Sequence, residues 1–209
     1  MAASTSRSQA AADKRRQILD AAVRVFARQG FHACRVSDIA DEAGVAYGLV
    51  YHYFSSKDEI LDTVFLERWS MLLHVIAEVD ERPVAAREKL RDIASFIVDS
   101  YVHDPDVMKV IIVEVTRAAN SFGRTHLAKI REAYDLIARI VAKGQAIGEL
   151  RTDVSPDFAA LAFYGTIEQV LTGWIFELLP QTPRDTESAK VQIVDTICDG
   201  LDVIGLPSA

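Results

Sequence analysis

The 209-residue chain has little cysteine and no long hydrophobic run, and both absences restrict what kind of protein it can be. Its two cysteines, Cys34 and Cys198, lie far apart, which favours free thiols in a reducing compartment over a disulfide framework. No apolar run reaches the roughly 18 residues that span a bilayer, and the N-terminus lacks the apolar core of a secretory signal. We therefore expect a cytoplasmic protein that does not bind membranes.

Motifs of catalysis and of cofactor binding are also missing. The sequence contains no nucleophile elbow, no HExxH pair, no phosphate loop and no cluster of Cys and His at zinc spacing. The histidines after residue 58, which are His74, His103 and His126, are scattered. We expect no catalytic residue, no metal and no cofactor, so the chain is not predicted to be an enzyme.

Alternation with period two is absent, whereas helical spacing of apolar residues runs through most of the chain. Pro83, Pro105, Pro156 and Pro183 stand where helices are expected to begin, because the missing N–H of proline costs nothing at the first helical position. The predicted fold class is therefore all-α. The predicted helices cover residues 11–29, 37–43, 47–54, 57–80, 83–102, 105–118, 121–147, 156–179 and 184–204.

The stretch from Ala43 to Leu61, AGVAYGLVYHYFSSKDEIL, is typical of the second half of a helix-turn-helix. Gly44 follows the helical pattern VSDIADEA and can adopt positive φ, so the chain can turn and restart within three residues at Tyr47. Ser56 and Glu59 are spaced as a capping box that starts a further helix. The short helix expected between Gly44 and Ser56 has two sides. One side carries Tyr47, Gly48, Tyr51 and His52, and the other carries Val50, Tyr53 and Phe54.

These residues resemble the TetR family of bacterial transcriptional repressors, whose N-terminal signature is similar to SDIADEAGVAYGLVYHYFSSKDEIL (Ser37 to Leu61). The resemblance implies a three-helix DNA-binding head followed by a six-helix domain that binds a ligand and dimerises. We expect a flexible arm over residues 1–12, the helix-turn-helix domain over 13–57, and the ligand-binding and dimerisation domain over 58–209. Charge agrees, since residues 1–57 hold 8 Lys and Arg against 5 Asp and Glu, and the remainder holds 15 against 25.

The resemblance also indicates which residues contact DNA. A helix in the major groove needs a small residue where its backbone approaches the bases and polar tips where phosphates lie. Ala46 departs from the family pattern, in which Ser or Thr commonly caps this helix, and the helix carries neither Arg nor Lys. We therefore expect apolar contacts and DNA shape to contribute more than bidentate hydrogen bonds. The predicted DNA contacts are Arg35, Ser37, Tyr47, Gly48, Leu49, Tyr51, His52 and Lys57.

The last two predicted helices carry more apolar surface than one core needs. Two copies that pair these helices into a four-helix bundle about a two-fold axis would cover the surplus, and members of the family dimerise in this way. The alternative is that both apolar stripes are internal core. The predicted dimer interface consists of Leu161, Tyr164, Ile175, Leu179, Ile193, Ile197, Leu201 and Ile204.

The body has the apolar character of a small-molecule site between helices. VEVTRAANSFGRTHLAKI (Val113 to Ile130) and FYGTIEQVLTGWIF (Phe163 to Phe176) resemble the branch of the family that senses long-chain fatty acyl-CoA and controls fatty-acid degradation. Cationic side chains would hold the CoA phosphates at the mouth of an apolar tunnel, which would equally suit a free fatty acid, a sterol or a hydrophobic drug. The predicted ligand contacts are Phe96, Tyr101, Met108, Ile112, Arg117, Asn120, Arg124, Tyr134, Phe163, Ile167 and Trp174.

Together these features predict a homodimeric repressor that binds a palindromic, double-stranded DNA operator and that a small hydrophobic ligand releases. Long-chain fatty acyl-CoA and the genes of fatty-acid metabolism are the first candidates for ligand and target. A second interpretation is a regulator of an efflux or catabolic gene that responds to a different hydrophobic ligand. A third is a ligand-binding scaffold whose head no longer binds DNA, which Ala46 and the lack of Arg in the second helix of the motif would explain.

Overall fold

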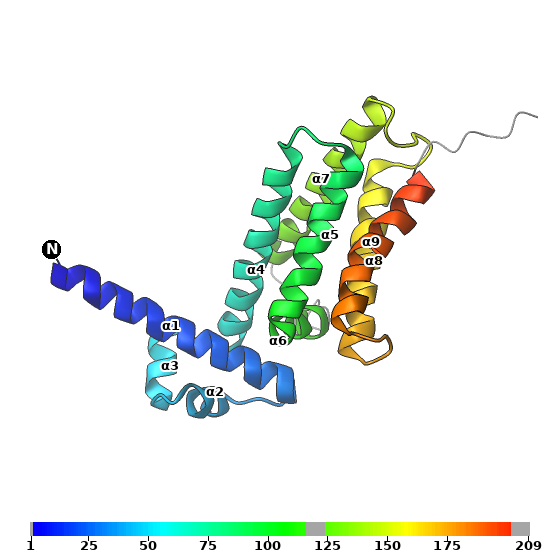
Figure 1. The fold of residues 1–209 in the computed structure, drawn as a ribbon. Coiled ribbons are helices and arrows are strands. Elements are labelled where there is room, and N and C mark those ends of the chain that lie inside the picture. The colour runs from blue at the N-terminus through cyan, green and yellow to red at the C-terminus, as the bar shows by residue number, and fades with distance from the viewer. Residues whose placement is uncertain (1, 116–123, 202–209) are drawn as a thin grey trace, which may run out of the picture. The chain divides into compact units, whose positions relative to one another are not determined.

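The computed structural model describes residues 2–115 and 124–201 (Figure 1). The described residues contain helices and no strand, which confirms the all-α prediction. The elements are α1 (Ala2–Gln29), α2 (Val36–Ala43), α3 (Tyr47–Tyr53), α4 (Lys57–Asp80), α5 (Ala86–His103), α6 (Pro105–Lys109), the π-helical η1 (Val110–Val115), α7 (Arg124–Ala146), α8 (Pro156–Ile175) and α9 (Pro183–Leu201).

Two compact units divide the chain, and we call the first the head and the second the body. The boundary falls inside α4, later than the predicted boundary at residue 58, and α6 after its first residue, Pro105, belongs to the head instead of the body. Apolar packing explains this, because Val107, Val110 and Ile111 are buried in the core of the head. The head comprises Met1–Arg68 and Asp106–Ser121, and the body comprises Trp69–Pro105 and Phe122–Ala209.

The head packs α1, α2 and α3 around one apolar core, to which Ile18, Phe26 and Ile39 contribute fully buried side chains (Figure 1). Gly44 ends α2 with φ of +61°, a left-handed conformation that favours glycine. The next residue closes the turn, because the Val45 N–H donates to the Ala40 carbonyl at 3.0 Å. α3 then restarts at Tyr47, so the predicted helix-turn-helix is present.

α1 begins at Ala2, well before the predicted start at residue 11, and therefore includes most of the predicted flexible arm. No glycine or proline occurs before Gly30, so the sequence offers no residue that would stop a helix there. Within the extension Gln9 donates a hydrogen bond to Asp13, one turn further on, at 3.0 Å. Gly30 ends the helix with φ of +81°, as the sequence predicts.

α2 begins at Val36, one residue before the predicted start at residue 37, and Arg35 is its N-cap residue. The cap is made by the backbone, because the Arg35 N–H donates to the Asp38 carboxylate at 2.8 Å. The acidic side chain in the first turn also complements the positive end of the helix dipole.

The start of α4 carries the predicted capping box in a modified form. The Glu59 N–H donates to the Ser56 hydroxyl at 3.1 Å, as expected for an N-cap serine. The Glu59 carboxylate instead accepts from the backbone N–H and the hydroxyl of Ser55, both at 2.6 Å. These two hydrogen bonds hold the pKa of Glu59 below its usual value.

The body packs α5, α7, α8 and α9 with the second half of α4 (Figure 1). One face of α8 lies in the core of the body. The buried side chains of that face are Phe163, Ile167, Leu171 and Trp174, each no more than 2 % exposed.

α5 starts at Ala86, three residues after the proline that was expected to open it. Pro83 lies in a tight turn, in which the Val84 N–H donates to the Arg82 carbonyl at 2.9 Å. The Ala86 N–H donates to the Glu149 carboxylate at 2.7 Å, so an acid far away in sequence caps the helix. A cap supplied by tertiary contact is invisible to a reading of local sequence.

A buried carboxylate connects three helices of the body. Asp80, the last residue of α4, is 4 % exposed. Its carboxylate accepts two hydrogen bonds from Lys143 Nζ on α7, at 2.8 and 2.9 Å. Lys89 Nζ on α5 donates to the Asp80 backbone carbonyl at 2.6 Å and lies 4.0 Å from its carboxylate. The two ammonium groups compensate an acid that would be costly to bury alone.

α8 ends at Ile175, four residues before the predicted end, because the chain folds back on itself. The Leu178 N–H donates to the Gly173 carbonyl at 2.7 Å, across Glu177 with φ of +56°. The Leu179 side chain then covers Gly173, where an added Cβ would lie 2.7 Å from Leu179 Cδ1. Glycine at this position allows the close return.

Candidate nucleic-acid interface and interior ligand site

α3 presents one face to solvent and the other to the core of the head, as the sequence predicts. Tyr47 and Tyr51 are 54 % and 45 % exposed, and Gly48 and His52 are exposed beside them. Val50, on the opposite face, is 1 % exposed. Such exposure is unusual for two neighbouring aromatic rings and suits a surface that binds a partner.

The two exposed tyrosines support each other. Their ring centroids lie 5.1 Å apart with an edge-to-face angle of 68°, and the Tyr47 hydroxyl donates to the Tyr51 hydroxyl at 3.2 Å. The Tyr51 hydrogen is then available to donate outward. Gly48 lies between them, and a Cβ there would meet nothing within 4 Å, so only the backbone limits how closely this side of α3 approaches another molecule.

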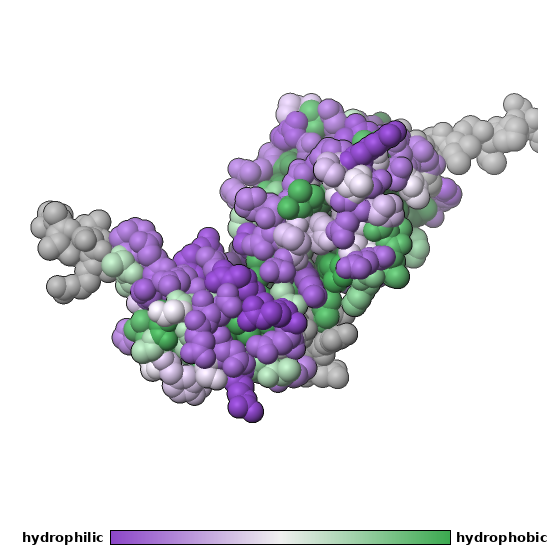
Figure 2. All heavy atoms as spheres, turned by 60° about the horizontal axis from the view of Figure 1, so that its bottom comes forward, coloured by the Kyte–Doolittle hydropathy of each residue, from purple (hydrophilic) through white to green (hydrophobic). Residues whose placement is uncertain are grey.

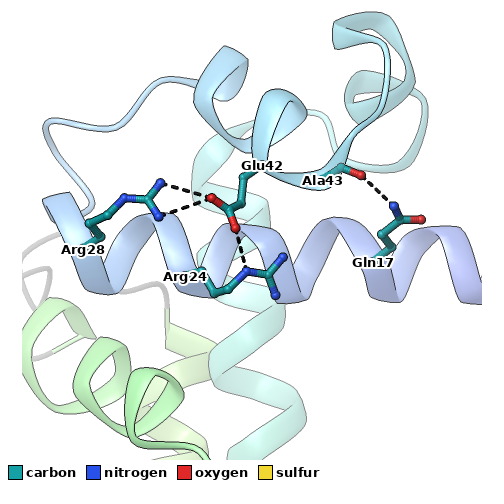
Figure 3. Close-up of polar contacts among 5 residues, drawn as sticks. All are labelled: Gln17, Arg24, Arg28, Glu42 and Ala43. Carbon is teal, nitrogen blue, oxygen red and sulfur yellow. Dashed lines mark hydrogen bonds and ion pairs between the residues drawn. The ribbon is translucent and has the colours of Figure 1, made fainter.

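Most cations of the head are engaged within it. Arg24 Nε donates to Glu42 at 2.7 Å, and both terminal nitrogens of Arg28 donate to the same carboxylate at 3.2 Å (Figure 3). These hydrogen bonds lower the pKa of Glu42. On the same helix, Arg15 and Arg16 both pair with Glu67 of α4, at 3.0 and 3.4 Å. These four arginines of α1 therefore join helices within the head.

Gln17 completes the attachment of α2 to α1. Its side-chain amide donates to the Ala43 carbonyl at 2.6 Å, at the C-terminal end of α2, while Glu42 is held by two arginines (Figure 3). This contact fixes the orientation of the helix-turn-helix and was missed by the sequence analysis. The only local signal is that Gln17 and Arg24 are seven residues apart, two helical turns along one side of α1.

Lys57 is a predicted DNA contact, but its ammonium group lies against the connection between α1 and α2. Its Nζ donates to the carbonyls of Phe31 and Cys34 at 2.6 and 2.8 Å and lies 4.5 Å from the centroid of the Phe31 ring. Two of its three N–H bonds stabilise the head. Lys57 lies at the start of α4 as expected, but its ammonium group is hydrogen-bonded within the head instead of being free to contact phosphate.

The remaining predicted DNA contacts lie at the start of α2 and on α3. Arg35 is exposed and forms no ion pair with the described residues, whereas Ser37 and Leu49 are half-buried. In Figure 2, which brings the α2 and α3 end forward, this surface is mostly hydrophilic with a small apolar area. One arginine, two phenols, a histidine and a helix N-terminus give this surface several hydrogen-bond donors and one permanent positive charge, which suits phosphate.

The body holds only some of the predicted ligand contacts, and they do not form one described site. Tyr101 and Trp174 stack with centroids 5.3 Å apart, the Tyr101 hydroxyl donates to Gln181 at 2.7 Å, and the Trp174 N–H donates to the Pro180 carbonyl at 3.0 Å. These contacts hold the connection between α8 and α9. Tyr134 of α7 instead packs edge to face against Tyr164 of α8, and Phe163 and Ile167, both 1 % exposed, belong to the core.

Two predicted ligand contacts belong to the other unit. Met108 and Ile112 lie in the segment assigned to the head, where Met108 packs against the core that contains Val107. Phe96 of α5 is half-buried in the body. Arg117 and Asn120 lie outside the described residues, and Arg124 begins α7 with a side chain that is not described.

The predicted dimer contacts are divided between surface and interior. Leu161 and Leu179 are 55 % and 44 % exposed, whereas Ile175 and Ile197 are half-buried. Ile193 is buried at 3 %, and Tyr164 points away from this face, since its ring packs against Trp69 and Tyr134. The side chain of Leu201 and all of Ile204 lie outside the described residues.

Within the parts of the chain that the structure describes, neither a metal cluster nor a membrane span is found. No three His, Cys, Asp or Glu side chains come together as metal ligands. No helix combines the length and the apolar character that crossing a bilayer requires.

A helix-turn-helix with an exposed aromatic and glycine face, followed by a helical body, defines a DNA-binding transcriptional regulator. The model of "Bacterial regulatory proteins, tetR family" matches residues 18–64, and that of "Tetracyclin repressor-like, C-terminal domain" matches residues 87–197. The chain belongs to the TetR family. The prediction of a regulator instead of an enzyme is confirmed by these matches.

The chain is similar to several transcriptional regulators, one of which is named for fatty-acid metabolism. The fatty acid metabolism regulator protein of Bacillus subtilis is 32 % identical over 160 residues, which cover 76 % of this chain and 82 % of that protein. The solved structure of FadR from Bacillus subtilis with stearoyl-CoA is 26 % identical, has a TM-score of 0.76, and covers 88 % of this chain and 98 % of its own. The repressor KstR2 of Rhodococcus jostii is 24 % identical and covers 90 % of this chain and 91 % of itself.

Proposed function

We propose that the protein is a homodimeric repressor that binds a palindromic operator and is released by long-chain fatty acyl-CoA, so that it controls genes of fatty-acid metabolism in the cytoplasm. The observation that carries this proposal is the exposed face of α3 in a chain related to the Bacillus subtilis regulator. Four arginines of α1 are engaged within the head, whereas the outer face of α3 is exposed and available to DNA.

In this proposal α3 lies in the major groove. Gly48 faces the bases, where it allows the backbone to approach, and Leu49 contacts a thymine methyl group. Tyr47, Tyr51 and His52 contact phosphate or sugar, and Arg35 contacts phosphate beside the N-terminus of α2 with Ser37. The lack of Arg and Lys in α3 predicts modest discrimination by hydrogen bonds and a larger part for DNA shape.

The second copy is proposed to cover the outer face of α8 and α9. A groove of about 380 Å³ runs between these helices, and a second hollow continues it along α8 past Ala162, Gly165 and Gln169. The exposed Leu161 and Leu179 on α8 and its following turn add apolar area, and Figure 2 shows apolar surface on this side of the body. A two-fold pair would present two heads to half-sites roughly 34–36 Å apart or a multiple of that distance.

Release requires a ligand that binds the DNA-bound and free states with different affinity. α4 is the proposed link, because Lys57–Arg68 belongs to the head and Trp69–Asp80 to the body. A ligand among α4, α7 and α8 would act directly on the body half of this helix. Acyl-CoA is the first candidate because the related FadR of Bacillus subtilis binds stearoyl-CoA.

A second candidate ligand is a different apolar molecule, such as a steroid. The relationship to KstR2, and the fold shared with a ketosteroid transcriptional regulator of Mycobacterium tuberculosis, favour it. The same DNA-binding and dimer surfaces would serve either ligand, so the two candidates differ only in the interior of the body.

A gel-shift titration of the purified protein on its own upstream DNA tests the proposal. We expect a retarded band whose stoichiometry is two chains per operator, and release by micromolar palmitoyl-CoA but not by CoA alone. Native mass spectrometry gives the number of chains and any co-purified acyl species. A monomer with no sequence-specific DNA affinity would contradict the proposal, and release by a steroid but not by palmitoyl-CoA would favour the second ligand.

A further inference from the structure

Three polar side chains gather inside the body where α4, α7 and α8 meet. The rings of Tyr134 on α7 and Tyr164 on α8 lie edge to face, with centroids 5.5 Å apart and an angle of 83°. Glu168 is one helical turn after Tyr164, on the same side of α8. Trp69 of α4 closes the group, with its ring centroid 5.8 Å from that of Tyr164.

None of the three polar groups forms a hydrogen bond or ion pair with a side chain or backbone group of the described residues, although all three residues are half-buried. Burial raises the pKa of Tyr134, Tyr164 and Glu168, and the nearby Glu168 charge raises the two phenol pKa values further. Partly buried polar groups are normally paired, since leaving them unpaired costs free energy. A ligand bound at these three side chains could supply the hydrogen-bond partners that the protein does not provide.

The walls of this group are rigid. The Trp69 N–H donates to the Lys129 carbonyl at 2.8 Å, which fixes the indole between α4 and α7. Phe163 and Ile167, which precede Tyr164 and Glu168 by one residue on α8, are each 1 % exposed, so the backbone that carries the two polar side chains is fixed in the core of the body. Few polar groups in an apolar setting fix the orientation of a ligand and determine which ligands are accepted.

We propose that Tyr134, Tyr164 and Glu168 form the polar anchor of the interior ligand site, which takes the neutral oxygen group of a long apolar molecule and excludes a carboxylate. The phenols donate to a carbonyl or hydroxyl oxygen, and Glu168 accepts from a hydroxyl. A ligand carboxylate would stand beside the acid of Glu168, where like charges repel and no cation of the described residues compensates them. This inference rests on the proposed function in that it assumes a ligand inside the body.

Binding of two ten-carbon probes to the full-length protein tests the anchor. Isothermal titration at pH 7.5 compares 1-decanol with decanoate, which differ in charge but share one chain length. We expect the wild-type protein to bind 1-decanol at least tenfold more tightly. Tyr134→Phe and Tyr164→Phe should each weaken 1-decanol binding by about three- to tenfold, as the loss of one neutral hydrogen bond predicts.

Glu168→Gln tests whether the acid of Glu168 causes the preference for 1-decanol over decanoate. This change keeps the shape of the side chain, and we expect the preference for 1-decanol to fall below threefold because decanoate binding improves. Asp157→Asn is the matched control, since it removes an exposed acid from the first turn of the same helix and should leave the preference unchanged. Equal affinity of both probes for the wild type, an unchanged preference in Glu168→Gln, or no binding of either probe would overturn the anchor.

The DNA experiment separates this inference from the proposed function. If palmitoyl-CoA still releases the operator while the two probes bind equally, the anchor is wrong and the repressor proposal stands. If the protein binds no specific DNA while Glu168→Gln removes the preference between the probes, the anchor stands and the repressor proposal fails.

Discussion

The head and the body each contain a glutamate whose pKa is shifted, but in opposite directions. Glu42 lies at the surface of the head between Arg24 and Arg28, whose hydrogen bonds lower its pKa. Glu168 is half-buried in the body beside two phenols, and burial raises its pKa. In the head, charge joins helices and leaves the outer face of α3 free. In the body, an acid stays uncompensated where an interior ligand would meet it.

The body does provide cations for another buried acid. Asp80 receives hydrogen bonds from Lys89 and Lys143, although it is less exposed than Glu168. The lack of a partner at Glu168 is therefore not a general property of the body. This contrast supports different roles for the two acids, with Asp80 holding the helices together and Glu168 available to a ligand.

The largest effect is expected where a buried acid is removed. Asp80→Ala leaves the Lys89 ammonium, whose side chain is 11 % exposed, without its acidic partner. We expect a loss of about 3–5 kcal/mol in the free energy of unfolding, as for other buried ion pairs that lose one member. Urea unfolding followed by circular dichroism measures this loss.

Asp153→Ala is the control for Asp80→Ala. It also removes an acid that pairs with a cation, Arg151, but the pair lies on the surface and close in sequence. Its urea midpoint should stay near the wild-type value. Equal losses in the two variants would show that Asp80 does not have a special structural role.

The next largest effect concerns the open side of α3. Gly48→Val places a branched side chain where the structure has empty space, so the fold has no clash to accommodate. Helix propensity even favours the change, since glycine is a poor helix former. We expect operator affinity to fall on the order of 100-fold, because the backbone can no longer approach the base edges.

Gly48→Ala supplies the graded comparison, with a smaller loss of operator affinity than Gly48→Val. Fluorescence anisotropy with labelled operator measures both variants, and thermal unfolding confirms that the head remains folded. Wild-type affinity in Gly48→Val would mean that α3 does not lie against the bases.

Local signals in the sequence determine most of the head but less of the body. Gly44, Tyr47 and the spacing between Ser56 and Glu59 act within a few residues, so the turn, the restart and the exposed face of α3 could all be predicted. The start of α5 could not, because its cap comes from Glu149, 63 residues away. Helix ends that depend on such distant contacts cannot be predicted from the neighbouring sequence.

Site residues follow the same rule. The exposure of one side of α3 follows from helical periodicity and could be predicted. The hydrogen bonds from the Lys57 ammonium group to the carbonyls of Phe31 and Cys34 depend on packing and could not. Tyr164 was assigned to a dimer face because its stripe is apolar, but the fold turns that side of α8 toward Trp69. Periodicity gives the faces of a helix, and only packing decides what each face meets.

A smaller effect is expected from single hydroxyl groups on the head. Tyr51→Phe removes the outward donor but keeps the ring stacked against Tyr47, so we expect about three- to tenfold weaker binding to every DNA sequence. Tyr53→Phe is the control, because that ring is half-buried and packs against the core of the head. Anisotropy titrations on operator and on unrelated DNA measure both. Equal losses of DNA affinity in the two variants would contradict a phosphate contact from the Tyr51 hydroxyl.

The smallest effects test the contrast between the two glutamates through pH. Hydrogen bonds from Arg24 and Arg28 hold the folded pKa of Glu42 below its ordinary value of 4.5, so its contribution to stability is present above about that pH and is lost as pH falls through the folded pKa. Glu168 has a raised folded pKa, so its contribution is present below 4.5 and is lost as pH rises through the folded pKa. Glu42→Gln should therefore lower the thermal midpoint at pH 7 and approach the wild type near pH 3. Glu168→Gln should raise the midpoint at pH 7 and lose that gain in acid. Thermal unfolding from pH 3 to pH 8 measures both variants, and shifts of the same sign at pH 7 would contradict the opposite pKa shifts of the two glutamates.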